Sequence, residues 1–262
     1  LMTPEITRKA EILGNTLKKY VQSGGSILLL PQSVRYANDQ DEKYWNTIFK
    51  PFDAEILHEG VFDLKNQVKN EIKPNYRKEQ FFYTENIVSH PAVKHVRQLW
   101  LPLHSYHMAA GTPAMKYGPE WTIVIRGEKS AKSFLSDPCS NQQTPSANNI
   151  GTYKTSPPIV AVRALGKGRV ACLPLDVIYT GQNYGNKFWS HIVENAGDPE
   201  SGRKSDGMKL IVSLAKWLGQ SNLNNPTLGT AETEKYNPVK FAESCNWDNF
   251  HFTRLAPGWW KN

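Results

Sequence analysis

The strongest constraint on the fold is a helix-forming segment that ends at two glycines and leads directly into a short apolar run. Residues 3–22 place apolar side chains at helical spacing, with Thr3 as a predicted N-cap and Pro4 at the first helical position. The glycine pair after Ser23 permits the left-handed turn that ends a helix. The run at 26–30 is typical of a strand buried on both faces of a parallel α/β sheet.

A β-hairpin and a second helix are the other clear patterns. Apolar runs at 158–165 and 169–175 flank a glycine-bearing turn, which predicts the hairpin. Residues 205–218 predict a helix with Ser205 as its N-cap and a buried stripe of leucine, isoleucine and tryptophan. Weaker patterns predict helices at 41–49, 91–98 (capped near Ser89) and 188–195. They also predict strands at 54–62 and 121–126. Residues 65–86 are an excursion without a clear period, and 136–156 are predicted to be a loop.

Composition and charge exclude several classes of protein. A chain of 262 residues that is 39% hydrophobic can bury a large core without disulfides or a metal. It contains no apolar run of about 18 residues, so no membrane-spanning helix is predicted. The 31 basic and 24 acidic residues give a net charge of +7, but the basic residues are dispersed. The charge therefore does not predict a nucleic-acid surface, and an anionic partner such as an acidic glycan is at least as compatible.

The three cysteines do not form a recognisable site. Cys139, Cys172 and Cys245 lack metal-ligand spacing, and an odd count argues against a disulfide framework. Cys172 lies in an apolar run and is expected to be a small buried residue. Cys139 and Cys245 lie in loop-like surroundings and can pair only in an oxidising compartment, so the sequence leaves the localisation open.

Three segments carry a resemblance to a known family. Residues 17–29 resemble the second helix and following strand of class I glutamine-amidotransferase-like domains, a group related to trehalose-utilisation proteins and to the middle domain of some β-galactosidases. Residues 166–170 resemble the late hairpin of that group, and 205–218 resemble its closing helix. The resemblance spans residues 3–218 and implies an α/β fold, a three-layer flavodoxin-like sheet with helices on both faces.

The chain departs from that family in two ways. A working amidotransferase is expected to carry its nucleophilic cysteine in a tight strand-to-helix elbow, and no cysteine here has that context. Only Leu1 and Met2 precede the first predicted helix, so relative to that family the first strands are expected to be missing, either because the chain is the later part of a longer polypeptide or because the fold is shortened. We therefore expect part of a longer multidomain protein, with a preceding domain or partner subunit covering the open sheet edge. The predicted domain spans 1–219, and 220–262 form an irregular aromatic tail.

The residues considered for catalysis are two histidines and two residues after the predicted hairpin. His104 and His107, spaced i, i+3, can share one helix face, but no acidic third ligand lies nearby, and a polar loop is the simpler interpretation. Asp176 and Tyr179 follow the hairpin at the carboxyl end of a strand, where open α/β sheets bind ligands. Asp176 is then a general base or an acceptor for a sugar hydroxyl, or it braces the following turn. No metal or cofactor is predicted.

Four further residues are candidates for ligand binding. Trp247, Trp259 and Trp260 can stack on sugar rings, although burial against another part of the protein is the simpler role. Arg126, at the end of a predicted strand, is a candidate anion contact or an ordinary surface charge. The Gly166-Lys167-Gly168 segment lacks the Ser/Thr and helix of a phosphate loop, so a hairpin turn is preferred.

These observations lead to one favoured function and two alternatives. The favoured function is a non-catalytic, amidotransferase-like accessory or oligomerisation module of a carbohydrate-active protein, with a glycan as a candidate ligand. The first alternative is a glycan-acting hydrolase or lyase that uses His104, His107 and Asp176 with the tail tryptophans as a platform. The second is a small-molecule-binding module without chemistry. A glycan-associated role favours the periplasm or the extracellular space.

Overall fold

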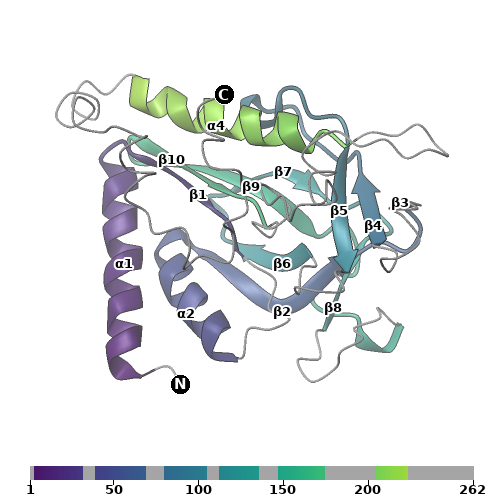
Figure 1. Ribbon diagram of the computed structural model, residues 1–262, viewed down its shortest axis with the longest axis horizontal. Helices are drawn as coiled ribbons and strands as arrows, with labels where there is room; N and C mark the ends of the chain where they lie inside the picture. The colour runs from purple at the N-terminus through teal and green to yellow at the C-terminus, as the bar shows by residue number, and fades with distance from the viewer. Residues whose placement is uncertain are drawn as a thin grey trace, which may run out of the picture.

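The computed structural model describes residues 3–31, 39–68, 80–104, 112–135, 147–174 and 205–223, and it confirms the α/β class (Figure 1). The helices are α1 (Pro4–Gln22), α2 (Asp39–Phe49) and α4 (Gly207–Leu223), with 3₁₀-helices η1 (Lys50–Phe52), η2 (Pro91–Val93) and η3 (Ala147–Asn149). The strands are β1 (Ser26–Leu29), β2 (Ala54–Phe62), β3 (Gln67–Val68), β4 (Gln80–Thr84), β5 (Leu99–His104), β6 (Thr112–Tyr117), β7 (Thr122–Arg126), β8 (Lys132–Leu135), β9 (Pro158–Leu165) and β10 (Gly168–Cys172). No helix among these residues is long and apolar enough to cross a membrane.

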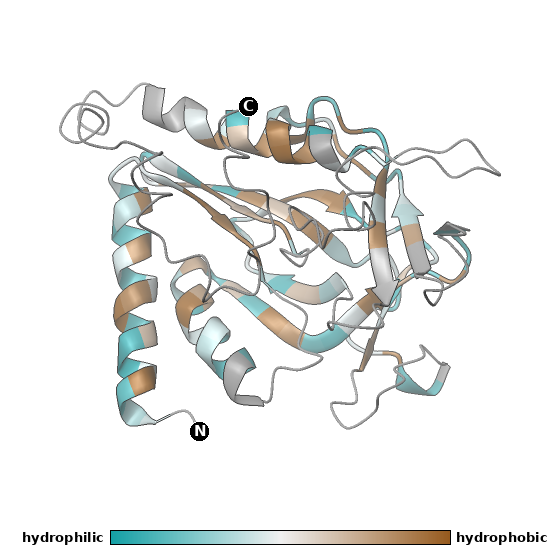
Figure 2. Cartoon of the chain, in the orientation of Figure 1, coloured by the Kyte–Doolittle hydropathy of each residue, from teal (hydrophilic) through white to brown (hydrophobic). Residues whose placement is uncertain are grey.

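Helix α1 begins and ends where its sequence predicts. The hydroxyl of Thr3 accepts a hydrogen bond from the backbone N–H of Ile6 at 3.3 Å, and Pro4 occupies the first turn. The buried side of α1 is lined by its small and β-branched residues, Ala10, Gly14 and Val21. A side chain at position 14 would lie 2.7 Å from the carbonyl oxygen of Ile48, so glycine is required for the close approach of α1 and α2. Figure 2 shows the alternating hydrophilic and hydrophobic bands along α1.

A four-stranded sheet in the order β1-β10-β9-β7 forms the centre of the molecule. Strand β1 pairs in parallel with β10, as the apolar run predicted, whereas the other two pairs are antiparallel. The prediction that β1 is buried on both faces is wrong: within the described sheet β1 is an edge strand, and Leu28 is 37% exposed. An apolar run predicts a strand, but its position in the sheet depends on residues far along the chain.

Helices cover both faces of this sheet, as the resemblance implied. On β10, Val170 and Cys172 belong to a core that includes Ala10 of α1, whereas Ala171 belongs to a core that includes Leu214 of α4. Successive side chains of a strand point to opposite faces, so α1 and α4 lie on opposite sides of the sheet, as Figure 1 shows. The structure differs from a flavodoxin-like sheet in its strand directions, since β1 and β10 form the only parallel pair among the described strands.

Two smaller antiparallel sheets complete the described part of the fold. Their orders are β6-β2-β8 and β3-β4-β5. The segment 65–86, treated as an excursion from its sequence, contributes β3 and β4 to the second of these sheets. Its aromatic and polar residues follow no regular period; β4 pairs with β5 and β3 pairs with β4, so strand pairing rather than a local pattern accounts for these two strands.

The hairpin and the closing helix match their predictions with adjusted ends. Strands β9 and β10 pair antiparallel around a turn in which Gly166 has a φ of +62°, a conformation that favours glycine. Helix α4 begins at Gly207 and continues through Gly219 to Leu223. Ser205 does not act as the predicted cap: its hydroxyl accepts from the backbone N–H of Trp100 at 3.3 Å. The predicted helix at 188–195 and residues 224–262 of the predicted tail lie outside the described residues.

Candidate functional site

Most residues predicted for catalysis or ligand binding lie outside the described part of the chain. These residues are His107, Asp176, Tyr179, Trp247, Trp259 and Trp260. The backbone of His104 is described as the last residue of β5, where it pairs with Gln80 of β4, but its side chain is not described. The described residues therefore do not test whether the predicted catalytic group comes together, and these roles stay predictions.

Arg126 is the one predicted site residue whose side chain is described. It ends β7 and is exposed. Its backbone is held in place, because the carbonyl accepts from the hydroxyl of Thr84 at 2.6 Å and the N–H donates to the carbonyl of Asn86 at 3.0 Å. Arg126 thus presents its guanidinium from a rigid strand end. Within the described ranges, no group of three or more His, Cys, Asp or Glu residues has the geometry of a metal site.

Cys172 is an inert structural residue, as its apolar run predicted. It lies in β10 and is fully buried in the core between the sheet and α1. Burial raises the pKa of the Cys172 thiol to about 12, and a hydrogen bond with Tyr117 offsets only part of this rise. Thiolates are the nucleophilic form of cysteine, so this side chain cannot serve as the nucleophile of an amidotransferase.

A pocket of about 630 Å³ lies beside α4 and forms the candidate site. It opens between the loop that follows η2 and the first half of α4. The described lining residues are Lys94, His95, Arg97, Lys209, Val212 and Ser213, and we call this the basic pocket. Three permanently charged cations and no acidic residue are among them. The basic pocket is suited to binding an anion.

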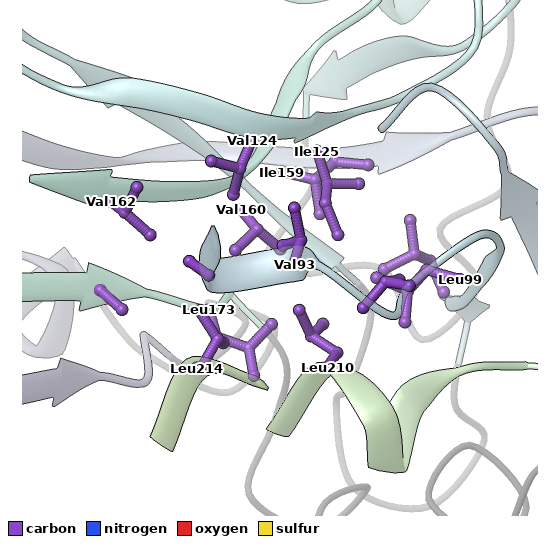
Figure 3. Close-up of a cluster of buried hydrophobic side chains, with 14 of the residues drawn as sticks. Val93, Leu99, Val124, Ile125, Ile159, Val160, Val162, Leu173, Leu210 and Leu214 are labelled. Atoms are coloured by element: carbon purple, nitrogen blue, oxygen red, sulfur yellow. The ribbon is translucent and has the colours of Figure 1, made fainter. Parts of the chain in front are cut away.

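Local sequence explains why the cationic side chains face the pocket. The predicted helix at 91–98 is the single 3₁₀ turn η2, capped by His90, whose Nδ1 accepts from the N–H of Ala92 at 3.1 Å. Ala92 and Val93 are buried, and Figure 3 shows Val93 in the apolar cluster with Leu210 and Leu214 of α4. Since the apolar residues of this turn point inward, the polar residues that follow them remain at the surface.

The carboxylate of Asp206 joins the two walls of the basic pocket. Its Oδ2 accepts from the backbone N–H groups of Arg97 at 2.9 Å and Gln98 at 3.4 Å. Its Oδ1 lies 2.5 Å from the ammonium of Lys209. The N–H of Asp206 donates in turn to the carbonyl of Gln98 at 2.9 Å. These contacts hold the start of α4 against the loop, so Asp206 positions the pocket rather than contributing free negative charge to it.

We expect the stability of the protein to depend on pH through Asp206. Burial raises the pKa of this carboxyl, but the hydrogen bonds from Lys209 and from the N–H groups of Arg97 and Gln98 outweigh burial and lower the pKa below 3.8. A depressed folded-state pKa stabilises the protein above the unfolded-state value and loses this contribution as pH falls through the folded-state value. Asp206→Asn should therefore cost about 1–3 kcal/mol in urea unfolding at neutral pH.

The difference between wild type and Asp206→Asn should begin to shrink as the pH falls below about 4, the unfolded-state pKa, and should disappear only below the lower folded-state pKa, where Asp206 is neutral. Glu11→Gln is the control. Glu11 is exposed on α1, so its substitution removes one negative charge far from the pocket. It should match wild type at both pH values. A difference for Asp206→Asn that stays the same at both values would contradict the electrostatic role.

The sequence analysis missed the basic pocket, although part of its signal was present. Lys94, His95 and Arg97 fall within four positions of one another, but among basic residues dispersed along the chain this group does not stand out. Lys209 lies more than a hundred residues further along the chain, and no local pattern connects it with the loop. Only the packing of α4 on η2 brings these residues to one pocket.

Comparison with known proteins does not identify the chain. No protein-family model matches it, and no curated protein matches it significantly.

Proposed function

We propose that this chain is a non-catalytic, amidotransferase-like accessory or oligomerisation module of a carbohydrate-active multidomain protein. The segments that carry the resemblance lie together in the fold: the hairpin strand β10 pairs with β1 directly after α1, and α4 packs on the same sheet. The carbohydrate association rests on the relatives named in the resemblance. The proposal that the module lacks amidotransferase activity rests on the burial of Cys172.

The burial of Cys172 is the observation that carries the non-catalytic assignment. Nucleophilic catalysis needs an accessible thiolate. Burial raises the pKa of the Cys172 thiol to about 12, so the thiol stays protonated at neutral pH. Cys172 is the only cysteine within the described residues. A strand in the middle of a core offers no room for a substrate.

An association role has support from the outer surface of α1. Ile6, Leu13 and Tyr20, spaced seven residues apart, are each about 40% exposed, and Ile12 is 53% exposed. Several apolar side chains exposed on one helix are more common at contact surfaces than on isolated monomers. This surface supports a partner subunit or a neighbouring domain as the covering element.

Cys172 should resist alkylation in the folded protein. Iodoacetamide at about pH 8 reacts with thiolates, so we expect no labelling of Cys172 in native protein and complete labelling in urea. Mass spectrometry of the peptide that contains Cys172 measures both states and separates this residue from Cys139 and Cys245. Labelling of native Cys172 at the rate seen in urea would contradict its assignment as a buried structural residue.

Activity assays test the function as a whole. We expect no ammonia release from glutamine and no new reducing ends from neutral or acidic glycans. Ammonia release that Cys139→Ser or Cys245→Ser abolishes would overturn the non-catalytic assignment. Glycan cleavage that Asp176→Asn abolishes would instead favour the hydrolase or lyase built on His104, His107 and Asp176.

A further inference from the structure

The basic pocket gathers three cationic side chains, and two of them have no carboxylate partner within the described residues. Lys209 is paired with Asp206. Within the described residues, no carboxylate lies within ion-pair distance of Lys94 or Arg97. Lys209 also lies in the first turn of α4, where the helix dipole is positive. Like charges gathered in one concave site repel one another, and a bound anion relieves this repulsion.

The size and the remaining lining of the pocket narrow the class of anion. A volume of about 630 Å³ lies within the range of small-molecule sites and far exceeds the space of one inorganic anion. Val212 adds an apolar surface, since it is 41% exposed, whereas Ser213 is only 5% exposed and adds little. A fitting ligand therefore carries at least one anionic group on a larger body that has some apolar surface.

Hydrogen bonds join the two walls of the pocket to each other. The loop and α4 are joined by the Asp206 contacts and by the hydrogen bond between Trp100 N–H and the Ser205 hydroxyl at 3.3 Å. Beneath them, His90 packs on the indole of Trp217 with ring centres 5.7 Å apart. Binding to such a site does not have to order the backbone, so more of the contact energy is available for affinity.

We propose that the basic pocket binds an acidic saccharide through its carboxylate or sulfate groups. Arg97 supplies a guanidinium, whose planar fork matches either oxyanion with two parallel hydrogen bonds. Lys94 supplies a second cation for the same or a neighbouring group. The sugar ring then lies against Val212 of α4. The anionic part of this proposal rests on the pocket alone, and the choice of a sugar rests on the proposed function.

Calorimetric titration of the full chain at constant ionic strength tests this proposal. The ligands are a galacturonate trisaccharide, galactose 6-sulfate, a neutral galactose trisaccharide and inorganic sulfate. We expect binding of one or both acidic sugars, no heat from the neutral sugar, and weaker binding of inorganic sulfate. Binding of the carboxylated sugar alone, or of the sulfated sugar alone, identifies which oxyanion the pocket selects.

Two matched variants locate the binding. Lys94→Gln/Arg97→Gln should weaken binding of the acidic sugar by about 10-fold or more, because each charge-assisted contact is lost. Lys129→Gln/Lys167→Gln removes the same charge from two exposed turn residues outside the pocket and should leave binding unchanged. Thermal unfolding of both variants shows whether either has lost its fold.

Several results would overturn the proposal. Equal binding of neutral and acidic sugars would show that charge is not recognised, and equal losses in the two double variants would show that only net charge matters. Inorganic sulfate that binds as tightly as the acidic sugars, or a short oligonucleotide that binds more tightly and loses affinity in the same variant, would overturn the sugar class. Glycan cleavage would refute the non-catalytic module and leave the pocket assignment unaffected, so the two failures are distinguishable.

Discussion

Replacing Gly168 with alanine is expected to destabilise the protein by about 3 kcal/mol or more. A side chain at position 168 would lie 2.0 Å from the carbonyl oxygen of Gly25 and 2.2 Å from that of Val21. Both oxygens belong to the backbone where α1 ends and β1 begins, so neither can move without disturbing the pairing of β1 with β10. Urea unfolding followed by circular dichroism measures the loss.

Gly219→Ala provides the matched control. This glycine lies inside α4, and no atom lies within 4 Å of where a side chain would begin. Alanine has the higher helix propensity, so this change should stabilise the protein by about 0.5–1 kcal/mol. A Gly168→Ala protein as stable as wild type would contradict the close approach of the hairpin to the end of α1.

Truncating Leu214 to alanine should cost about 3–4 kcal/mol. Leu214 lies on α4, is fully buried, and packs in the core shared with Val162 of β9 and Leu173 (Figure 3). Its removal leaves a cavity between the helix and the sheet, and the loss includes both the transfer of the side chain and the missing contacts around the cavity. Urea unfolding measures the change in the free energy of unfolding.

Val212→Ala is the control on the same helix. Val212 is 41% exposed, so this truncation should change stability by less than about 0.5 kcal/mol. If Leu214→Ala were as mild as Val212→Ala, the packing of α4 on the central sheet would be contradicted. The basic pocket would then lose one of its walls as well.

Elements with strong local signals were predictable from sequence. Helix α1 has its N-cap, its proline and its glycine stop within one continuous segment, and the hairpin of β9 and β10 has a glycine turn between two apolar runs. Such signals act between neighbouring residues, so the tertiary structure does not need to be known. The predicted end of α4 at Leu218 was wrong, because Gly219 resembles a helix stop in sequence but lies inside a helix that continues to Leu223.

The candidate site shows the opposite case. The predicted residues were chosen because of their chemistry, yet all except Arg126 have side chains outside the described part of the chain. The basic pocket instead depends on charged residues that look ordinary in sequence. Lys94 and Arg97 become a site only because Val93 packs inward on Leu210 and places the loop beside α4.

The amino-acid sequence alone determined the α/β class, the extent of α1, the presence of the hairpin and the burial of Cys172, because hydrophobic period, caps and turn residues act locally. The tertiary structure decided the order and direction of the strands, the edge position of β1 and the convergence of Lys94, Arg97 and Lys209. Strand pairing and helix docking depend on contacts between residues far apart in the chain, and a local sequence pattern does not specify which strands or helices will contact one another.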